Sequence, residues 1–196
     1  MKQQPSVSIQ KLYDVKQQMF EANYERWVND VLFTFNWWLL IILTLVVIFI
    51  WLKALDTSRL LEILFVGLCI GILATILDVT GDSLSFWTYG YKVVQIITPL
   101  NPVDLAVLPV AYMLIYQWFT KWKPYIWATI ALAAIGTFVA EPVFELLGIY
   151  HLNTWKFIYS FPIYIAMGIG IKALTHKMMA IQRRARSTKQ GEEDAT

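Results

Sequence analysis

Long apolar runs separated by short polar stretches dominate this chain. The run from Val31 to Leu52 contains 22 residues and no charged side chain. As an α-helix it would be about 33 Å long, enough to cross a bilayer core of about 30 Å. The pattern predicts five membrane-spanning helices: Val31–Leu52, Leu60–Val79, Pro102–Phe119, Tyr125–Gly148 and Trp155–Leu174. We therefore expect an all-α, polytopic transmembrane helix bundle.

The two ends of the chain follow different patterns. In residues 1–30, apolar side chains recur at roughly every third or fourth position, beginning with Ile9. This spacing is typical of an amphipathic helix that lies on a membrane or on the bundle. Residues 175–196 are first basic and then acidic, which predicts a helix near the membrane followed by a disordered end. The transmembrane domain itself covers residues 31–174.

Composition supports a membrane protein and excludes other classes. Of the residues, 58% are hydrophobic and 15% are charged, whereas about a quarter are charged in a soluble domain. The basic residues form no patch beside aromatic side chains, so we expect no nucleic-acid partner. The single Cys69 has no disulfide partner within the chain, and His151 and His176 are not at metal-ligand spacing. We expect no metal and no cofactor.

Lys and Arg are unequally divided between the two sides of the predicted membrane. The side with the N-terminus and the loops after the second and fourth helices carries six of them. The side with the C-terminal tail carries ten. Because cytoplasmic segments carry the excess of positive charge, we expect a multi-pass plasma-membrane protein with a cytoplasmic C-terminus.

Two helix hairpins in the second part of the chain carry similar acidic and aromatic segments. The first hairpin has the sequence DVTGDSLSFWTYGY, and the second, 63 residues later, has EPVFELLGIYHLNTW. Both hairpins run out and back in the same sense, which indicates a parallel repeat. Membrane composition alone is the alternative explanation. The residues concerned are Asp78, Asp82, Trp87 and Tyr89 in the first segment, and Glu141, Glu145, Tyr150 and Trp155 in the second.

Glu141 is the most informative of these acids. It lies about 10 Å inside the outer end of its predicted helix, with Glu145 one turn further along the same face. Two like charges there require a retained proton or a partner. Pro142 predicts a kink beside them. We interpret these acids and the nearby aromatic residues as a candidate ligand or ion site formed by Asp78, Asp82, Trp87, Tyr89, Glu141, Glu145, Tyr150, Trp155 and Tyr159.

Several polar residues also have a purely structural interpretation. Asp82 in TGDS can cap a turn after Gly81. In NPVD, Asn101 and Asp104 fit the N-cap and first turn of a helix. Lys172, near the inner end of the fifth helix, is interpreted as a lysine that extends its ammonium group to the membrane boundary.

The segment EPVFELLGIYHLNTWKFIYSFPIY resembles the signature of an uncharacterised family of small multi-helix membrane proteins of Gram-positive bacteria. That family tends to show two acids separated by three residues, then a GxY step, a WKxxYS segment and a Pro–Tyr pair. The matching residues are Glu141, Gly148, Tyr150, Trp155, Lys156, Tyr159, Ser160 and Pro162. The resemblance implies a bacterial membrane protein and no specific activity.

A looser similarity links DVTGDSLSFWTYGY to the lycopene-cyclase-like membrane domain of carotenoid synthesis. There, an acid, a glycine and a WxY step recur in repeated helix hairpins, and a proline-led pair of acids supplies proton chemistry. This chain has Val110 and Ala111 in LPVAYM at the matching place. The similarity therefore implies a pocket for an isoprenoid or another lipid, without the cyclase reaction.

Three functions fit these features. The first is binding, without catalysis, of a hydrophobic lipid-like or isoprenoid-like ligand, or of a membrane partner protein, between the two hairpins. The second is a small transporter coupled to protons or cations through Glu141 and Asp78. The third is an enzyme that modifies an isoprenoid, which is the least favoured because the sequence contains no P-loop or nucleophile motif.

Overall fold

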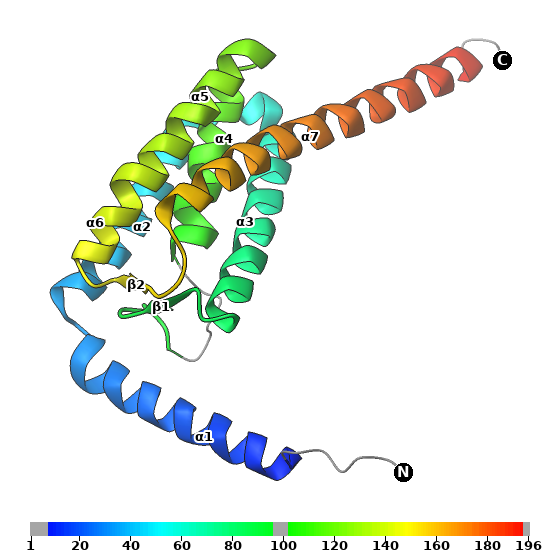
Figure 1. Cartoon of the computed structure of the whole chain (residues 1–196). Helices are drawn as coiled ribbons and strands as arrows, with labels where there is room; N and C mark the ends of the chain where they lie inside the picture. The colour runs from blue at the N-terminus through cyan, green and yellow to red at the C-terminus, as the bar shows by residue number, and fades with distance from the viewer. Residues whose placement is uncertain (1–7, 96–101, 194–196) are drawn as a thin grey trace.

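The computed structural model describes residues 8–95 and 102–193 (Figure 1). Helices α2 to α7 form a bundle, α1 leaves this bundle at one end, and the second half of α7 projects from the other end. The helices are α1 Ile9–Arg26, α2 Phe35–Ala54, α3 Leu60–Ser83, α4 Leu108–Trp118, α5 Trp122–Ile135, α6 Glu141–Leu146 and α7 Phe157–Glu193. Shorter turns are η1 Trp27–Val31, η2 Thr57–Arg59, η3 Val103–Val107 and η4 Gly136–Ala140, and the strands are β1 Trp87–Tyr89 and β2 Tyr150–Leu152.

The all-α membrane architecture is confirmed. Four helices are long and apolar enough to cross a membrane: Phe35–Ala54, Thr57–Ser83, Trp122–Leu146 and Phe157–Ala185. The third expected span, Pro102–Phe119, corresponds to the helix Val103–Trp118, which is apolar but shorter. It begins with the π-helical turn η3, and the helix ends where Phe119 leaves the helical conformation.

Several expected boundaries are wrong for local reasons. The first span begins at Phe35 because Phe33 has a φ of 59° and the Thr34 side chain caps the helix at Trp37 N. The last span continues as α7 to Glu193, so the acidic end is helical as far as the structure describes it. Pro142 lies in the first turn of α6, which follows the π-helical turn η4, and the kink expected there remains a prediction. The proposed N-cap Asn101 lies outside the described residues.

The amphipathic N-terminal helix is confirmed as α1. None of its residues is buried, and Figure 1 shows it pointing away from the bundle. Its end is attached at the π-helical turn η1, where Trp27 Nε1 donates to the carbonyl of Lys92 at 2.9 Å. α1 therefore does not pack on the bundle, and contact with a membrane surface remains a prediction.

The core is formed by α3, α4, α5 and α7, with α2 on the outside. Tyr112 and Tyr125 are fully buried, and each ties its helix to α7. The Tyr112 hydroxyl donates to the carbonyl of Tyr164 at 2.7 Å, and the Tyr125 hydroxyl donates to that of Gly168 at 2.8 Å. α2 contributes one buried residue, Leu40. The short α4 is thus the centre of the bundle rather than a lipid-facing span.

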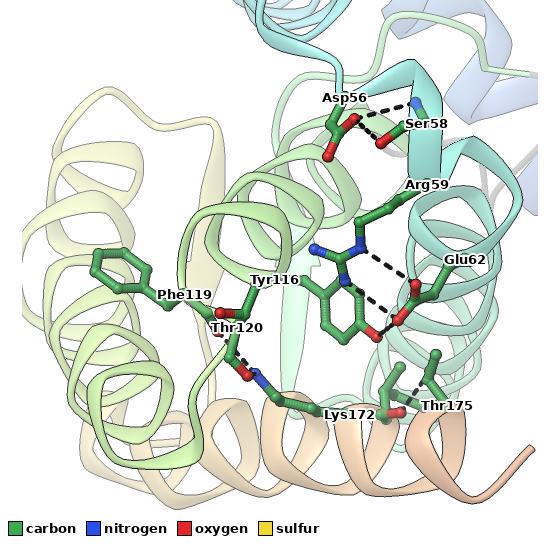
Figure 2. Close-up of polar contacts among 10 residues, drawn as sticks. Asp56, Ser58, Arg59, Glu62, Tyr116, Phe119, Thr120, Lys172 and Thr175 are labelled. Atoms are coloured by element: carbon green, nitrogen blue, oxygen red, sulfur yellow. Dashed lines mark hydrogen bonds and ion pairs between the residues drawn. The ribbon is translucent and has the colours of Figure 1, made fainter. Parts of the chain in front are cut away.

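Lys172 stabilises the end of the bundle opposite the strands (Figure 2). Its side chain is 0% exposed, and its ammonium group donates to the carbonyls of Phe119 at 2.7 Å and Thr120 at 3.0 Å. The ammonium also lies 3.9 Å from the centre of the Tyr125 ring. These carbonyls follow the C-terminus of α4, where a positive charge is favoured. Lys172 therefore bonds to the protein backbone at the end of the bundle, and its position relative to a membrane boundary remains a prediction.

The same end of the bundle contains a second polar group. Arg59 forms an ion pair with Glu62 at 3.2 Å, and the Tyr116 hydroxyl donates to the same Glu62 carboxylate (Figure 2). Every charged group in this contact has a partner, as a membrane interior requires.

Gly168 permits the close packing of α7. A methyl group at Gly168 would lie 2.7 Å from both Thr129 Cγ2 and Tyr112 Cε1, whereas one at Gly170 would meet nothing within 4 Å. Overpacking costs about 1–3 kcal/mol. We expect Gly168→Ala to lower the thermal midpoint of the detergent-purified protein, and Gly170→Ala to leave it unchanged or slightly raised, because Ala favours helix over Gly. Equal midpoints for the two variants would contradict this packing.

Candidate functional site

The ends of the two hairpins are joined by a pair of short antiparallel strands. Trp87 pairs with Leu152, Thr88 with His151, and Tyr89 with Tyr150. An offset of 63 residues maps β1 onto β2, since Trp87 corresponds to Tyr150 and Tyr89 to Leu152. The same offset maps the end of α3, Ser83, onto the end of α6, Leu146. Each strand therefore pairs with its counterpart in the other hairpin, in the symmetric register that a repeat of two hairpins would produce.

Backbone contacts fix this pairing. The carbonyl of Phe86 accepts from the backbone N–H groups of Asn153 at 2.9 Å and Thr154 at 3.2 Å. A side chain at Gly90 would lie 2.1 Å from the carbonyl oxygen of Gly148. Glycine is therefore required there by the close approach of the two loops.

Asp78 is held by the strand that follows its own helix. It is 9% exposed, and its Oδ1 accepts from Trp87 Nε1 at 3.1 Å and from the Tyr89 hydroxyl. The Trp87 ring packs so closely on α3 that a Cβ added at Gly81 would lie 2.0 Å from it. The predicted grouping of Asp78, Trp87 and Tyr89 therefore exists in the structure.

Glu141 points into the bundle and is held by α7. Its Oε1 accepts from the Tyr164 hydroxyl at 2.7 Å, and its Oε2 accepts from Ser160 Oγ at 3.2 Å. Ser160 Oγ in turn accepts from Trp155 Nε1 at 3.1 Å. Trp155 stacks on Phe86, with ring centres 5.3 Å apart. Glu141 and Trp155 thus contribute to one network that also contacts the first hairpin.

Asp104 is the third acid of the site, and sequence reasoning missed it. It lies in the π-helical turn η3, is 8% exposed, and has a carboxyl group within hydrogen-bonding reach of Asp78. Its Oδ2 has no hydrogen-bond partner among the described residues. Its interpretation as a first-turn helix acid explains its position in the chain but not its burial.

Two adjoining cavities lie at this end of the bundle. The first, of about 110 Å³, is called the polar cavity, and its polar groups are Asp78, Asp104, Glu141, Ser160 and the hydroxyls of Tyr89, Tyr91, Tyr150 and Tyr164. The second, of about 170 Å³, is called the apolar cavity, and its apolar wall is formed by Ala74, Leu77, Phe86, Leu108, Ile163 and Met167. The two share Asp78, Trp87, Asp104, Trp155, Ser160 and Tyr164.

Tyr150 supplies a neutral hydroxyl to the polar cavity. Burial, and then the nearby charge of Glu141, raise the pKa of the Tyr150 phenol above its ordinary value. Its enclosed hydroxyl makes no hydrogen bond of normal geometry among the described residues. It can therefore donate to a bound group.

Three predicted site residues lie elsewhere. Asp82 and Glu145 line neither cavity, although each is one turn from an acid that does. Tyr159 is 46% exposed and packs its ring on Trp155 from outside the cavities. Asp82 and Glu145 follow the cavity-lining acids by four residues and so lie near the site. They lie beyond it, however, because α3 and α6 continue toward the loops.

Ser160 and Tyr164 were also absent from the predicted site. Both belong to the segment YSFPIY. The resemblance of this segment to a family signature is the signal that could have identified them as site residues. Comparison with family models, curated proteins and solved structures finds no match for this chain. Both family resemblances therefore remain predictions.

The contact between Tyr164 and Glu141 can be tested by a matched pair of variants. Tyr164→Phe removes a hydrogen bond to a half-buried carboxyl group, which costs about 1–2 kcal/mol. Tyr159→Phe removes a hydroxyl from a residue that is 46% exposed. We expect only Tyr164→Phe to lower the thermal midpoint in detergent. If both variants behave like wild type, Glu141 does not depend on α7 as described.

Proposed function

We propose that this chain is a multi-pass membrane protein that binds an amphiphilic ligand. The polar head occupies the polar cavity and the tail occupies the apolar cavity. The observation that carries the proposal is that a cavity lined by three acids and four tyrosines shares six lining residues with a cavity whose wall is more apolar. Ligand pockets typically combine an apolar wall with a few convergent polar groups.

The dimensions of the cavities support a ligand of this kind. An apolar cavity of about 150 Å³ is enough to bind benzene. At about 170 Å³ the apolar cavity admits part of a hydrocarbon chain, and the polar cavity, at about 110 Å³, admits only a small head. Leu77 lines the apolar cavity and is 39% exposed, so the cavity lies close to the surface of α3. A longer tail can continue from there along the outside of the bundle.

The proposal includes a location in the bacterial plasma membrane with the C-terminus in the cytoplasm. The bacterial assignment rests on the resemblance of the Glu141–Pro162 segment. The topology is supported by the basic residues at one end of the bundle, opposite the cavities. Lys53 and Arg59 flank the joint between α2 and α3, and Lys121 and Lys123 lie at the joint between α4 and α5 (Figures 1 and 2).

Mass spectrometry of small molecules retained by the detergent-purified protein tests ligand binding. We expect wild type to retain an amphiphile, and Leu77→Trp to lose it because the larger side chain fills the apolar cavity. Val79→Trp is the matched control, since Val79 lies two residues along α3 and lines neither cavity. Retention of no compound by wild type, or equal retention by Leu77→Trp, would contradict the proposal.

Ion-coupled transport is a second candidate, favoured by one observation. Asp78, Asp104 and Glu141 come from three different elements, and no Lys, Arg or His of the described chain lines their cavity. Such acids in membrane helices often form proton or cation paths. On this hypothesis, the purified protein in vesicles carries a proton or cation flux that Glu141→Gln abolishes while the protein still folds. Vesicles that show no flux with wild type would exclude it.

A further inference from the structure

The acids of the polar cavity have no basic side chain beside them in the cavity wall. Asp78, Asp104 and Glu141 line it, and no basic side chain of the described residues does. The charge of Lys92 acts on Asp78 from outside the cavity, since its ammonium lies 5.6 Å from the centre of the Tyr89 ring and its side chain lines a different hollow, beside η1. Among the described residues the ion pair between side chains is Arg59–Glu62, at the opposite end of the bundle. Acids buried in this way need positive charge or protons from elsewhere.

Asp104 shows where the missing group would bind. Asp78 and Glu141 each accept two hydrogen bonds from the protein, whereas Oδ2 of Asp104 accepts none among the described residues. Asp104 is 8% exposed and lines both cavities. A buried carboxylate oxygen without a donor is costly, so a donor on a bound molecule would stabilise it. The carboxyl group of Asp78 lies within reach of the same group.

Much of the remaining wall of the polar cavity is aromatic. The rings of Trp87, Tyr89, Tyr91, Tyr150, Trp155 and Tyr164 line the polar cavity. Aromatic faces attract cations, and cages of such rings recognise ammonium groups. The acids and the rings therefore favour the same kind of occupant, and both disfavour an anion.

A bare metal ion fits this site less well than an organic cation. Among the described residues, no three His, Cys, Asp or Glu side chains lie close enough together to hold a metal. A hydroxyl head carries a single donor and no charge, whereas a protonated amine has up to three donors and one positive charge. A protonated amine can thus donate a hydrogen bond to Oδ2 of Asp104 and also supply a positive charge to the acids of the cavity.

We infer that the head group of the bound amphiphile is a protonated amine, held by the carboxyl groups of Asp104 and Asp78, with Glu141 and the aromatic rings in the surrounding wall. This inference rests on the proposed function, because it names the chemical class of the ligand for the same pair of cavities. The hydrocarbon tail follows the apolar cavity between α3 and α7.

Two probes of equal chain length test the inference. The full chain is placed in nanodiscs of phosphatidylcholine, and retention of radiolabelled dodecylamine and dodecanol is measured against empty nanodiscs. We expect dodecylamine to bind about tenfold or more tightly than dodecanol, since only the amine gains the ionic and cation–π contacts. Asp104→Asn should weaken dodecylamine binding about tenfold and leave dodecanol unchanged.

Asp82→Asn is the charge-matched control. It also removes one acid at this end of the bundle, but Asp82 lines neither cavity, so dodecylamine binding should be unchanged. Glu141→Gln provides a second variant in the cavity if Asp104→Asn does not yield a monodisperse protein, with the same expected loss.

The outcomes separate this inference from the proposed function. Equal binding of both probes, each reduced by Leu77→Trp, would overturn the amine head and keep the amphiphile site. Dodecylamine binding that falls equally with Asp104→Asn and Asp82→Asn would also overturn it, because general surface charge then explains the preference. Binding of neither probe above empty nanodiscs would overturn both proposals.

Discussion

The pairing of β1 with β2 is the interaction on which the candidate site depends. Each strand has three residues, and the pair joins the ends of two hairpins that are 63 residues apart. The pairing brings Trp87 and Tyr89, which hold Asp78, against Tyr150, which lies beside Glu141. Without it, the two acids would belong to two separate helix ends. Lipid offers no partners for an open strand edge, so the two strands also satisfy one another.

The two ends of the bundle differ in whether the chain itself supplies partners for the buried charged groups. At one end, the ammonium of Lys172 meets two carbonyls and an aromatic ring, and Glu62 meets Arg59 and Tyr116. These charges are satisfied within the chain and stabilise the joints between helices. At the other end, Oδ2 of Asp104 has no hydrogen-bond partner among the described residues, and the Tyr150 hydroxyl lies beside Glu141 without a hydrogen bond of normal geometry. Unsatisfied groups persist in a native structure where function requires them, which is why the second end is the candidate site.

The fold and part of the site could be predicted from the sequence, for reasons that particular residues make clear. Helix positions follow from long apolar runs, and Asp78 and Glu141 stood out because an acid in such a run is costly. Asp104 could not be found in this way, since NPVD is ordinary helix-start chemistry and its burial arises from contact with Asp78 on a different helix. The partners of Lys172 could not be predicted either, because the carbonyls that bind it follow α4, more than fifty residues earlier in the chain. Three-residue strands are too short to produce a recognisable alternation.

The repeat explains the position of the two predicted acids but not the chemistry of the cavity. Asp78 and Glu141 occupy equivalent places, yet Asp78 is held by the strand after its own helix and Glu141 by the returning helix α7. The third acid enters from the π-helical turn η3 of the first hairpin alone. In the second hairpin the π-helical turn η4 instead precedes Pro142, on the outgoing helix. The two hairpins thus contribute unequally to the cavities: Glu141 lines the polar cavity alone, whereas Asp78 and Asp104 lie where the polar and apolar cavities meet. This asymmetry would give the proposed ligand a defined orientation, which two identical half-sites would not.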